Sequence, residues 1–280
     1  MFQSKRLTVI AGPCSLETED MCMKIAEFAV KATSDLGLEY IFKGSFDKAN
    51  RTSADSFRGN GLERGLSILY KIRKEFDIPV LTDVHETHQV DSVAKIVDVI
   101  QIPAYLCRQT SLIEAAVKRV NKKTYITSAL NIKKGQFLAP WDCEMIVKKA
   151  KSFNPKLKRN ELWLTERGSS FGYNNLVVDM KGIHYLKKTG CPVIMDATHA
   201  VQEPGGKGSS SGGKRFLVPL IARAGVAAGV DGVFMEIHPD PNTALSDGPN
   251  MINLEEFRSL ISELSKIHKL VNSFSSSDEI

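Results

Sequence analysis

Short apolar runs rich in β-branched residues alternate along the chain with longer stretches in which apolar residues recur every three to four positions. The short runs predict strands and the longer stretches predict amphipathic helices. The predicted strands are Leu7–Cys14, Tyr40–Phe46, Val80–Val84, Val99–Pro103, Tyr125–Ile132, Glu161–Arg167, Pro192–Thr198 and Gly232–Ile237. The predicted helices span about 17–36, 61–76, 88–95, 109–120, 142–152, 175–189, 215–229 and 254–272.

This strict alternation predicts the class of fold. Strands that alternate with helices indicate parallel βαβ units, because parallel neighbours need a crossover connection. Eight such units in 280 residues fit an α/β fold with one domain, the closed (β/α)8 TIM barrel. An open doubly wound sheet is the alternative. It usually carries a glycine-rich dinucleotide fingerprint after its first strand, and AGPCSLE (11–17) is not one.

Two segments lie outside the alternation. EPGGKGSSSGGK (203–214) is rich in glycine and serine, so we expect it to lack regular structure and to serve as a lid after the seventh strand. The tail SFSSSDEI (273–280) is polar and is expected to fray. No domain boundary is evident, so residues 1–280 are expected to form a single catalytic domain.

Composition narrows the class of protein. The chain is 42% apolar and 25% charged, as in water-soluble globular proteins, and no apolar run approaches the roughly 20 residues of a membrane span. The first residues lack a signal-peptide core, so a cytoplasmic protein is expected. The net charge of +5 is mixed along the predicted helices without a basic stripe, which argues against a nucleic-acid partner.

The cysteines are odd in number and scattered, which fits neither a disulfide framework nor a CxxC zinc site. Reduced thiols are therefore expected. They are Cys14, Cys22, Cys107, Cys143 and Cys191.

Chemically active side chains follow every predicted strand. In a barrel these carboxyl ends form the active site. They read GPC (12–14), KGSFDKANR (43–51), TDVHE (82–86), QIP (101–103), NIKK (131–134), TERG (165–168), DATH (196–199) and MEIH (235–238). A barrel built only for stability would not need such groups at all eight ends, so the pattern indicates a catalytic mouth.

Cations dominate these strand ends. Arginine binds phosphate and carboxylate through two parallel hydrogen bonds, and lysine supplies a point charge. So many cations at one mouth would repel one another unless a multiply anionic ligand neutralised them, and two phosphorylated substrates would suffice. For any single lysine a solvent-facing position is the commoner case, so the expectation rests on the set: Lys43, Lys48, Arg51, Arg108, Lys133, Lys134 and Arg167.

A second set is typical of a metal site. Strands one, seven and eight become neighbours when the barrel closes, so the residues at or after their ends can converge. A thiolate, an imidazole and two carboxylates suit Mn, Fe, Co or Zn. Taken alone, a free cysteine is more often a buried structural thiol, and His85 and His238 fit the spacing equally well. The candidate ligands are Cys14, His199, Glu236 and Asp247.

Ten motifs carry a resemblance that runs over about residues 8–270: IAGPC, FKGSFDKANRTS, TDVHE, IQIPAYLCRQT, KKGQFLAPWD, TERGSSFGYNNLVVDM, DATHAVQ, PGG, DGVFMEIHPDP and ALSDGPN. Together they resemble the 3-deoxy-D-manno-octulosonate 8-phosphate (KDO8P) synthases. The resemblance implies a TIM-barrel transferase that condenses phosphoenolpyruvate with D-arabinose 5-phosphate and water in lipopolysaccharide biosynthesis. It also implies a cytoplasmic homotetramer.

Two details of the motifs bear on substrate and metal. A sister family, the 3-deoxy-arabino-heptulosonate 7-phosphate synthases, uses erythrose 4-phosphate and typically carries KPRT where this chain has KANR (48–51). Members of the resembled family that work without metal have asparagine in place of Cys14 and tend to have cysteine in place of Ser246, so both residues resemble the metal-dependent class. Gly248-Pro249 resembles the metal-independent pattern instead.

The resemblance also implies a role for each site residue. Phosphoenolpyruvate would be bound by Lys43, Ser45, Lys48, Lys134 and Arg167. Arabinose 5-phosphate would be bound by Asn50, Arg51 and Thr52, with Gln202 lining the sugar site and Arg108 reaching a substrate phosphate across a subunit interface. The implied catalytic residues are Lys48, Asp83, His85 and His199. Whether the divalent metal orients the aldehyde or activates water stays open.

Two further classes remain as alternatives. A non-catalytic barrel that binds sugar phosphates would form no product. A metal-dependent aldolase would cleave its product reversibly and release no phosphate.

Overall fold

A computed structural model describes residues 6–51, 53, 56–206 and 212–274. Eight of its strands are β1 (Thr8–Gly12), β2 (Glu39–Lys43), β3 (Val80–Asp83), β4 (Val99–Ile102), β5 (Ala129–Lys133), β6 (Leu162–Glu166), β9 (Val193–Asp196) and β12 (Gly232–Glu236). They pair in parallel and close in the order β1-β12-β9-β6-β5-β4-β3-β2. The predicted (β/α)8 barrel is confirmed, and β1, β12 and β9 are neighbours as expected.

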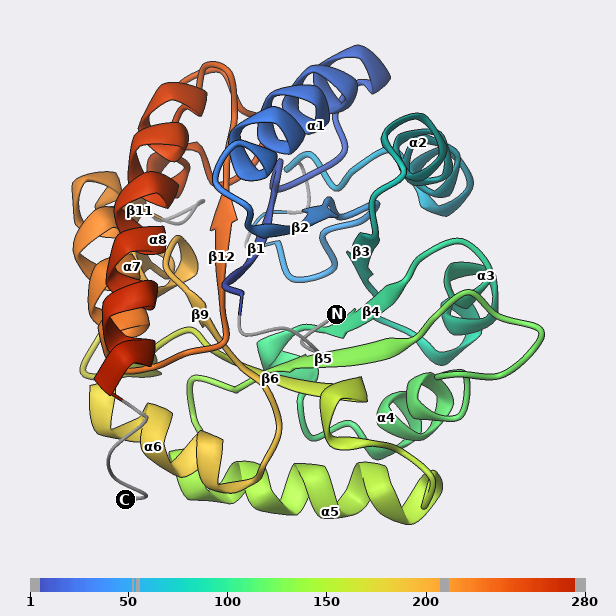
Figure 1. Cartoon of the computed structure of the whole chain (residues 1–280). Coiled ribbons are helices and arrows are strands. Elements are labelled where there is room, and N and C mark those ends of the chain that lie inside the picture. The colour runs from blue at the N-terminus through green and yellow to red at the C-terminus, as the bar shows by residue number, and fades with distance from the viewer. Residues whose placement is uncertain (1–5, 52, 54–55, 207–211, 275–280) are drawn as a thin grey trace.

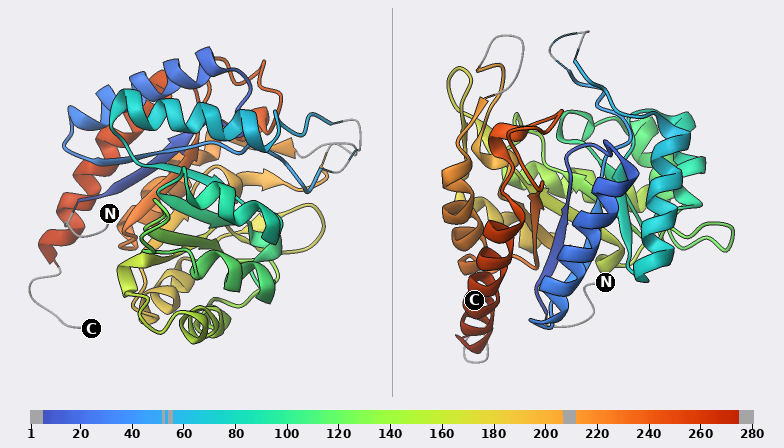
Figure 2. Two further views of the ribbon diagram at one scale, coloured as in Figure 1. Left: turned by 90° about the vertical axis from the view of Figure 1, so that its right-hand side faces the viewer. Right: turned by 90° about the horizontal axis from the view of Figure 1, so that it is seen from above.

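The helices surround the barrel (Figure 1) and lie alongside its strands (Figure 2). They are α1 (Glu19–Ser34), α2 (Leu62–Phe76), α3 (Val90–Ala94), α4 (Thr110–Val117), α5 (Cys143–Phe153), α6 (Met180–Lys188), α7 (Val218–Ala227) and α8 (Leu254–Phe274). Short 3-10 helices are η1 (Thr87–Gln89), η2 (Ala104–Leu106), η3 (Pro140–Asp142), η4 (Arg159–Glu161), η5 (His199–Val201), η6 (Arg215–Leu217) and η7 (Gly248–Asn250). None of the helices within the described ranges has the length and apolar character needed to cross a bilayer.

Two layers of apolar side chains arise from the alternation of strand residues between faces. Outward-facing residues such as Val9, Phe42 and Leu164 pack in the core between the strands and the helices. Each strand also sends one buried apolar side chain into the barrel, so the interior is filled at that level. These eight residues are Ile10, Ile41, Leu81, Val99, Ala129, Trp163, Ile194 and Phe234.

The predicted strand Tyr125–Ile132 begins too early, because β5 starts at Ala129. The β-branched residues before it pack against the preceding unit instead. Ile126 N and Thr127 N donate to Ala94 O, and Thr127 Oγ1 donates to Val97 O. A run of β-branched residues held by hydrogen bonds to the preceding unit therefore gave the sequence pattern of a strand without a strand being present.

The predicted helix 175–189 is wrong in its first turn. Residues Leu176–Val177 form β8, which pairs antiparallel with β7 (Ser169–Ser170). The helix begins at Met180, where the side chain of Asp179 accepts a hydrogen bond from Lys181 N and caps the helix.

The segment 203–214 has more regular structure than its composition predicts. Its ends pair as the hairpin of β10 (Gln202–Glu203) and β11 (Gly212–Gly213). Residues 207–211 lie outside the described residues, and the lid role stays a prediction. In the tail, the frayed segment was predicted to begin at residue 273, but α8 continues through Phe274, and 275–280 are also outside the described part.

The last residue of β1 has no room for a side chain. A Cβ at Gly12 would lie 2.0 Å from the backbone oxygen of Lys43 on the neighbouring strand β2. Two barrel strands would have to separate to accept it, exactly where β1 leads into Cys14. A glycine is therefore required by close backbone approach.

We predict that Gly12→Ala lowers the free energy of unfolding by about 3 kcal/mol, since the overlap is with backbone that cannot rotate away. Gly37→Ala is the control. Its φ is +65° with nothing within 4 Å, so only the backbone conformation opposes the change, at a cost of about 1 kcal/mol. Urea unfolding of both variants measures the difference, and equal losses would contradict the steric explanation.

Candidate active site

A ring of mostly polar side chains lies directly above the apolar layer inside the barrel. Side chains two residues apart on a strand share a face, so each strand adds one inward-facing residue at its carboxyl end. The ring consists of Gly12, Lys43, Asp83, Gln101, Asn131, Thr165, Asp196 and Glu236. Every strand contributes one such residue, because each ring residue lies two positions after the residue that the same strand contributes to the apolar layer.

Three residues of this ring, Lys43, Asp83 and Gln101, line a cavity of about 790 Å³ at the barrel mouth. Eleven residues with predicted roles line it or lie in its wall: Lys43, Ser45, Lys48, Asn50, Arg51, Asp83, His85, Arg167, His199, Gln202 and Asp247. The β12–η7 connection forms one side, through residues 241–249. The structure thus gathers substrate-binding and catalytic candidates from separate strand ends into one cavity.

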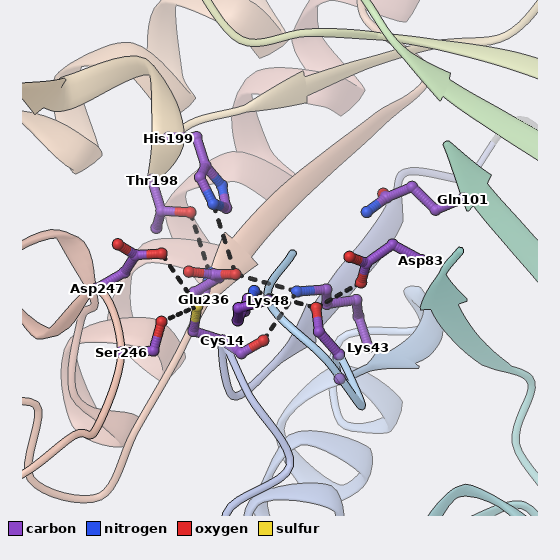
Figure 3. A network of polar contacts seen from close by, with 12 residues as sticks. Cys14, Lys43, Lys48, Asp83, Gln101, Thr198, His199, Glu236, Ser246 and Asp247 are labelled. Atoms are coloured by element: carbon purple, nitrogen blue, oxygen red, sulfur yellow. Dashed lines mark hydrogen bonds and ion pairs between the residues drawn. The ribbon is translucent and has the colours of Figure 1, made fainter. Parts of the chain in front are cut away.

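Three of the four predicted metal ligands form one cluster. One ligand atom each of Cys14, Glu236 and Asp247 lies within 4.8 Å of the others. Cys14 Sγ contacts Ser246 Oγ at 2.9 Å and donates to Asp247 Oδ2 at 3.1 Å. Figure 3 shows these side chains pointing toward one another from loops at opposite ends of the chain.

His199 lies at the edge of this cluster. Its Nε2 is 3.7 Å from Glu236 Oε1, and its Nδ1 is 2.9 Å from Asp196 Oδ2. Asp196 thereby orients the imidazole with Nε2 toward the cluster, as carboxylates behind a histidine ligand do in metal sites. The two alternative histidines lie outside the cluster: His85 Nε2 pairs with Asp83, and His238 Nδ1 contacts Asp240 O.

The cluster fits a divalent cation in two respects. Glu236 Oε2 is buried and has no hydrogen-bond partner among the described residues, so a lone pair is available for a ligand. Asp247 adopts a left-handed backbone (φ 52°), which is uncommon for a residue other than glycine and costs about 1 kcal/mol or more. A thiol and two carboxylates match the donor preferences of Mn, Fe, Co and Zn.

The electrostatics of the cluster favour a positive ligand. Burial raises the pKa of the Cys14 thiol well above its usual value, and the charges of Asp247 and Glu236 raise that pKa further. Burial also raises the pKa of Glu236, but His199, Lys43 and Lys48 outweigh it and lower the net value to about 2. Glu236 is therefore anionic, and a cation beside it would favour the Cys14 thiolate.

A second group surrounds Asp83 on the opposite side of the cavity. Ser45 Oγ donates to Asp83 Oδ1, and His85 Nε2 lies 2.9 Å from Asp83 Oδ2. Lys48 Nζ donates to Ser45 Oγ at 3.0 Å. Burial opposes ionisation of Asp83, but the hydrogen bond from His85 and the nearby lysines hold its pKa well below the usual range. The carboxylate therefore stays charged and orients His85.

Sequence reasoning assigned no role to Asp196 and named Lys133 only within the set of cations at the mouth. The two form a buried pair, with Nζ to Oδ2 at 2.6 Å. Lys133 Nζ also lies 3.9 Å from the centroid of the Phe234 ring, within cation–π range. Arg215 was likewise missed. It lines the cavity from η6 and donates to Gly248 O at 2.7 Å. Alternation along β5 and β9 could have revealed the pair, but nothing in the sequence marked Arg215.

Three predicted substrate ligands are not placed in the cavity. Lys134 Nζ donates to Ser169 Oγ at 3.0 Å and lies 3.5 Å from Glu166 Oε1. Arg108 is exposed and does not line the cavity. Thr52 lies outside the described residues.

A parallel barrel with cations, carboxylates and a thiol converging at its carboxyl end defines a class of enzyme that acts on small anionic substrates. The sequence narrows the class further, since residues 3–272 match the DAHP synthetase I family. The chain belongs to this family.

Curated relatives cover nearly the whole chain. The 2-dehydro-3-deoxyphosphooctonate aldolase of Francisella tularensis subsp. holarctica is 50% identical over 268 residues, which is 95% of this chain and 94% of the relative. The proteins of the same name from Cyanothece sp. and Nitrosococcus oceani are 52% and 51% identical. These matches cover 91% and 95% of this chain, and 90% and 91% of the two relatives.

We predict that Glu236→Gln flattens the acid limb of the stability profile of the metal-free protein. The carboxylate has a lower pKa in the folded protein than its ordinary value of 4.5. It therefore stabilises the fold above that pH, and the contribution is lost as the pH falls toward about 2.

Urea unfolding at pH of about 5.5 and about 3.5 tests this prediction. The wild type should lose roughly 1 kcal/mol more than Glu236→Gln over the interval. The exposed Glu27→Gln on α1 controls for removal of a carboxylate. Parallel profiles for wild type and Glu236→Gln would contradict it.

Proposed function

We propose that this chain condenses phosphoenolpyruvate with D-arabinose 5-phosphate and water to form 3-deoxy-D-manno-octulosonate 8-phosphate and phosphate, a step of lipopolysaccharide biosynthesis. The observation that carries the proposal is a cavity lined by buried cations whose donors are not all used. Arg167 Nη1 and Arg51 Nη2 are buried without a hydrogen-bond partner among the described residues. The relatives' name supports this particular reaction.

The cations bind and orient the two anionic substrates. Lys43, Lys48 and Arg167 take the phosphate and carboxylate of phosphoenolpyruvate, while Arg51 and Asn50 take arabinose 5-phosphate at the outer rim. Arg167 Nη2 donates to Gln202 Oε1 at 3.1 Å, which leaves its second amino group directed at ligand. Holding both substrates together removes a large entropic part of the barrier.

The reaction joins C3 of phosphoenolpyruvate to the aldehyde carbon of the sugar. Water adds to C2, and phosphate leaves by cleavage of the C2–O bond. Negative charge develops on the aldehyde oxygen, so a proton must reach it. His85 fits this role: Asp83 holds its Nε2, whereas its Nδ1 has no partner among the described residues and can exchange the proton. Lys48 stabilises the developing charge nearby.

We further propose that the enzyme is metal-dependent, with Cys14, Glu236, Asp247 and His199 as ligands. The three-residue cluster and the unpartnered Glu236 Oε2 support this. A bound Mn, Fe, Co or Zn ion would either orient the aldehyde or lower the pKa of water. The residues of this chain hold the donors in place: Asp196 orients His199, and Gln202 Nε2 donates to Asp247 Oδ1 at 3.2 Å.

We also propose a homotetramer in which Arg108 reaches the cavity of a neighbouring subunit. Arg108 is exposed and does not line the cavity of its own chain. Its side chain is therefore available to a substrate phosphate bound in a neighbouring subunit.

A substrate panel tests the sugar specificity. The alternative within the family is the heptulosonate synthase, which uses erythrose 4-phosphate. We expect roughly tenfold or greater kcat/KM for arabinose 5-phosphate, because the KANR segment presents Asn50 at the cavity. Loss of phosphoenolpyruvate and release of phosphate measure turnover, with a sugar-free reaction as control. Faster turnover of the four-carbon sugar would exclude the proposal, and reversible cleavage without phosphate release would indicate an aldolase.

Chelation and add-back test the metal. We expect activity to fall at least about a hundredfold in metal-free protein and to return with Mn, Fe, Co or Zn. Cys14→Ala should abolish both metal binding and activity, because a direct thiolate ligand is lost. Cys22→Ala, a buried thiol on α1, is the matched control and should keep both. Full activity in rigorously metal-free wild type would refute the metal role.

A further inference from the structure

Two loops from opposite ends of the chain carry Cys14 and Asp247, which form the cluster together with Glu236 of β12. Cys14 lies in the β1–α1 connection, and Ser246 and Asp247 lie in the β12–η7 connection. The contacts of Cys14 Sγ with Ser246 and Asp247 join these loops at the cluster itself. A further hydrogen bond between the two loops lies outside the donor set.

Glu17, three residues after Cys14, makes this further contact. Its Oε1 accepts a hydrogen bond from Leu245 N at 2.9 Å, directly before Ser246 and Asp247. Its Oε2 lies 4.0 Å from His238 Nε2, just after β12. The side chain is only 10% exposed. One carboxylate therefore contacts both ends of the segment 238–245.

The backbone around Glu17 is itself fixed. Asn60 Nδ2 donates to Leu16 O at 2.6 Å and to Glu17 O at 2.7 Å. Leu16 N donates to Ser45 O at 3.0 Å, which joins this loop to the end of β2. Glu17 thus projects from an anchored support, and its side chain can hold a neighbour in place.

The contact falls where the β12–η7 loop turns inward. Leu245 is 53% exposed, whereas Ser246 is 4% exposed and Asp247 follows with its left-handed backbone. Within the described ranges, the bond from Leu245 N is the one backbone hydrogen bond that residues 244–246 make. Without it, the unfavourable conformation of Asp247 could relax away from Cys14.

We propose that Glu17 is a positioning residue that holds the loop of Asp247 against the loop of Cys14 through its reach to Leu245 N. The inference rests on the proposed role of Cys14 and Asp247 as metal ligands. It assigns Glu17 no contact with substrate or metal. The length of the side chain and an acceptor oxygen are what matter, so the negative charge is dispensable.

Two conservative variants separate reach from charge. Glu17→Gln keeps the length and a carbonyl oxygen that can accept from Leu245 N, but it loses the charge. Glu17→Asp keeps the charge but is one methylene too short. The matched control is Glu19→Asp, the same shortening at an exposed residue of α1 whose partner is Lys71.

The first readout is alkylation of Cys14 by iodoacetamide in the metal-free protein, followed by mass spectrometry. Cys14 is fully buried, so it reacts only when the loops separate. We expect labelling of Cys14 to be at least about tenfold faster in Glu17→Asp and within about twofold of wild type in Glu17→Gln. Cys143, a buried thiol on α5, reports general loosening in the same sample and should not change.

The opposite ranking, with Glu17→Gln fast and Glu17→Asp slow, would overturn the proposal in favour of a purely electrostatic role. Equal labelling of both variants and wild type would also overturn it, as would fast labelling of Cys143 together with Cys14.

The second readout is titration of metal-free protein with cobalt(II), followed by the thiolate-to-cobalt absorption band. Affinity should fall at least about tenfold in Glu17→Asp and remain close to wild type in Glu17→Gln. A wild type without the band would refute the proposed metal centre. The alkylation ranking would still decide the role of Glu17, so the two failures are distinguishable.

Discussion

The ion pair between Lys43 and Glu236 lies inside the barrel, with both side chains at most 2% exposed. Taking a charge out of water costs several kcal/mol unless a partner compensates it, so such a group dictates its surroundings. The same constraint pairs Lys133 with Asp196 and places His85 and Lys48 around Asp83. The ring above the apolar layer is therefore a set of fixed charges, and its geometry is specified by the pairs.

These pairs also determine what remains for a ligand. Although the ring carboxylates pair with lysine or histidine, donors without a partner among the described residues remain at the cavity, including Arg167 Nη1 and Arg51 Nη2. Guanidinium groups stay charged even when burial lowers the pKa, as it does for Arg167. The charged side chains around the cavity are thus largely paired with one another, while some guanidinium nitrogens have no partner among the described residues. Such a cavity is suited to binding phosphate and carboxylate groups.

The sequence predicted the barrel and most of the mouth because both depend on periodicity. Alternation assigns Ile10 and Gly12, or Phe234 and Glu236, to the same inner face once the strand is located. It failed where a run of β-branched residues resembled a strand, as at Ile126 and Thr127. This error matters because the position of β5 decides which lysine faces inward. With Ala129 and Asn131 on the inner face, Lys133 also faces inward, beyond the ring, and Lys134 does not, since a shift by one residue exchanges the faces.

The metal candidates differ in how well the sequence predicts them, according to whether they lie on a strand or on a loop. Glu236 is fixed by its strand, and its place could be predicted from register alone. The orientation of His199 depends on Asp196, and the position of Asp247 depends on a loop whose contacts lie far away in sequence. Such contacts leave no periodic signal, because a hydrogen bond between residues 228 positions apart constrains neither residue's neighbours. The donors on loops are consequently the part of the site whose alignment depends on supporting residues, whereas the ring is aligned by the barrel itself.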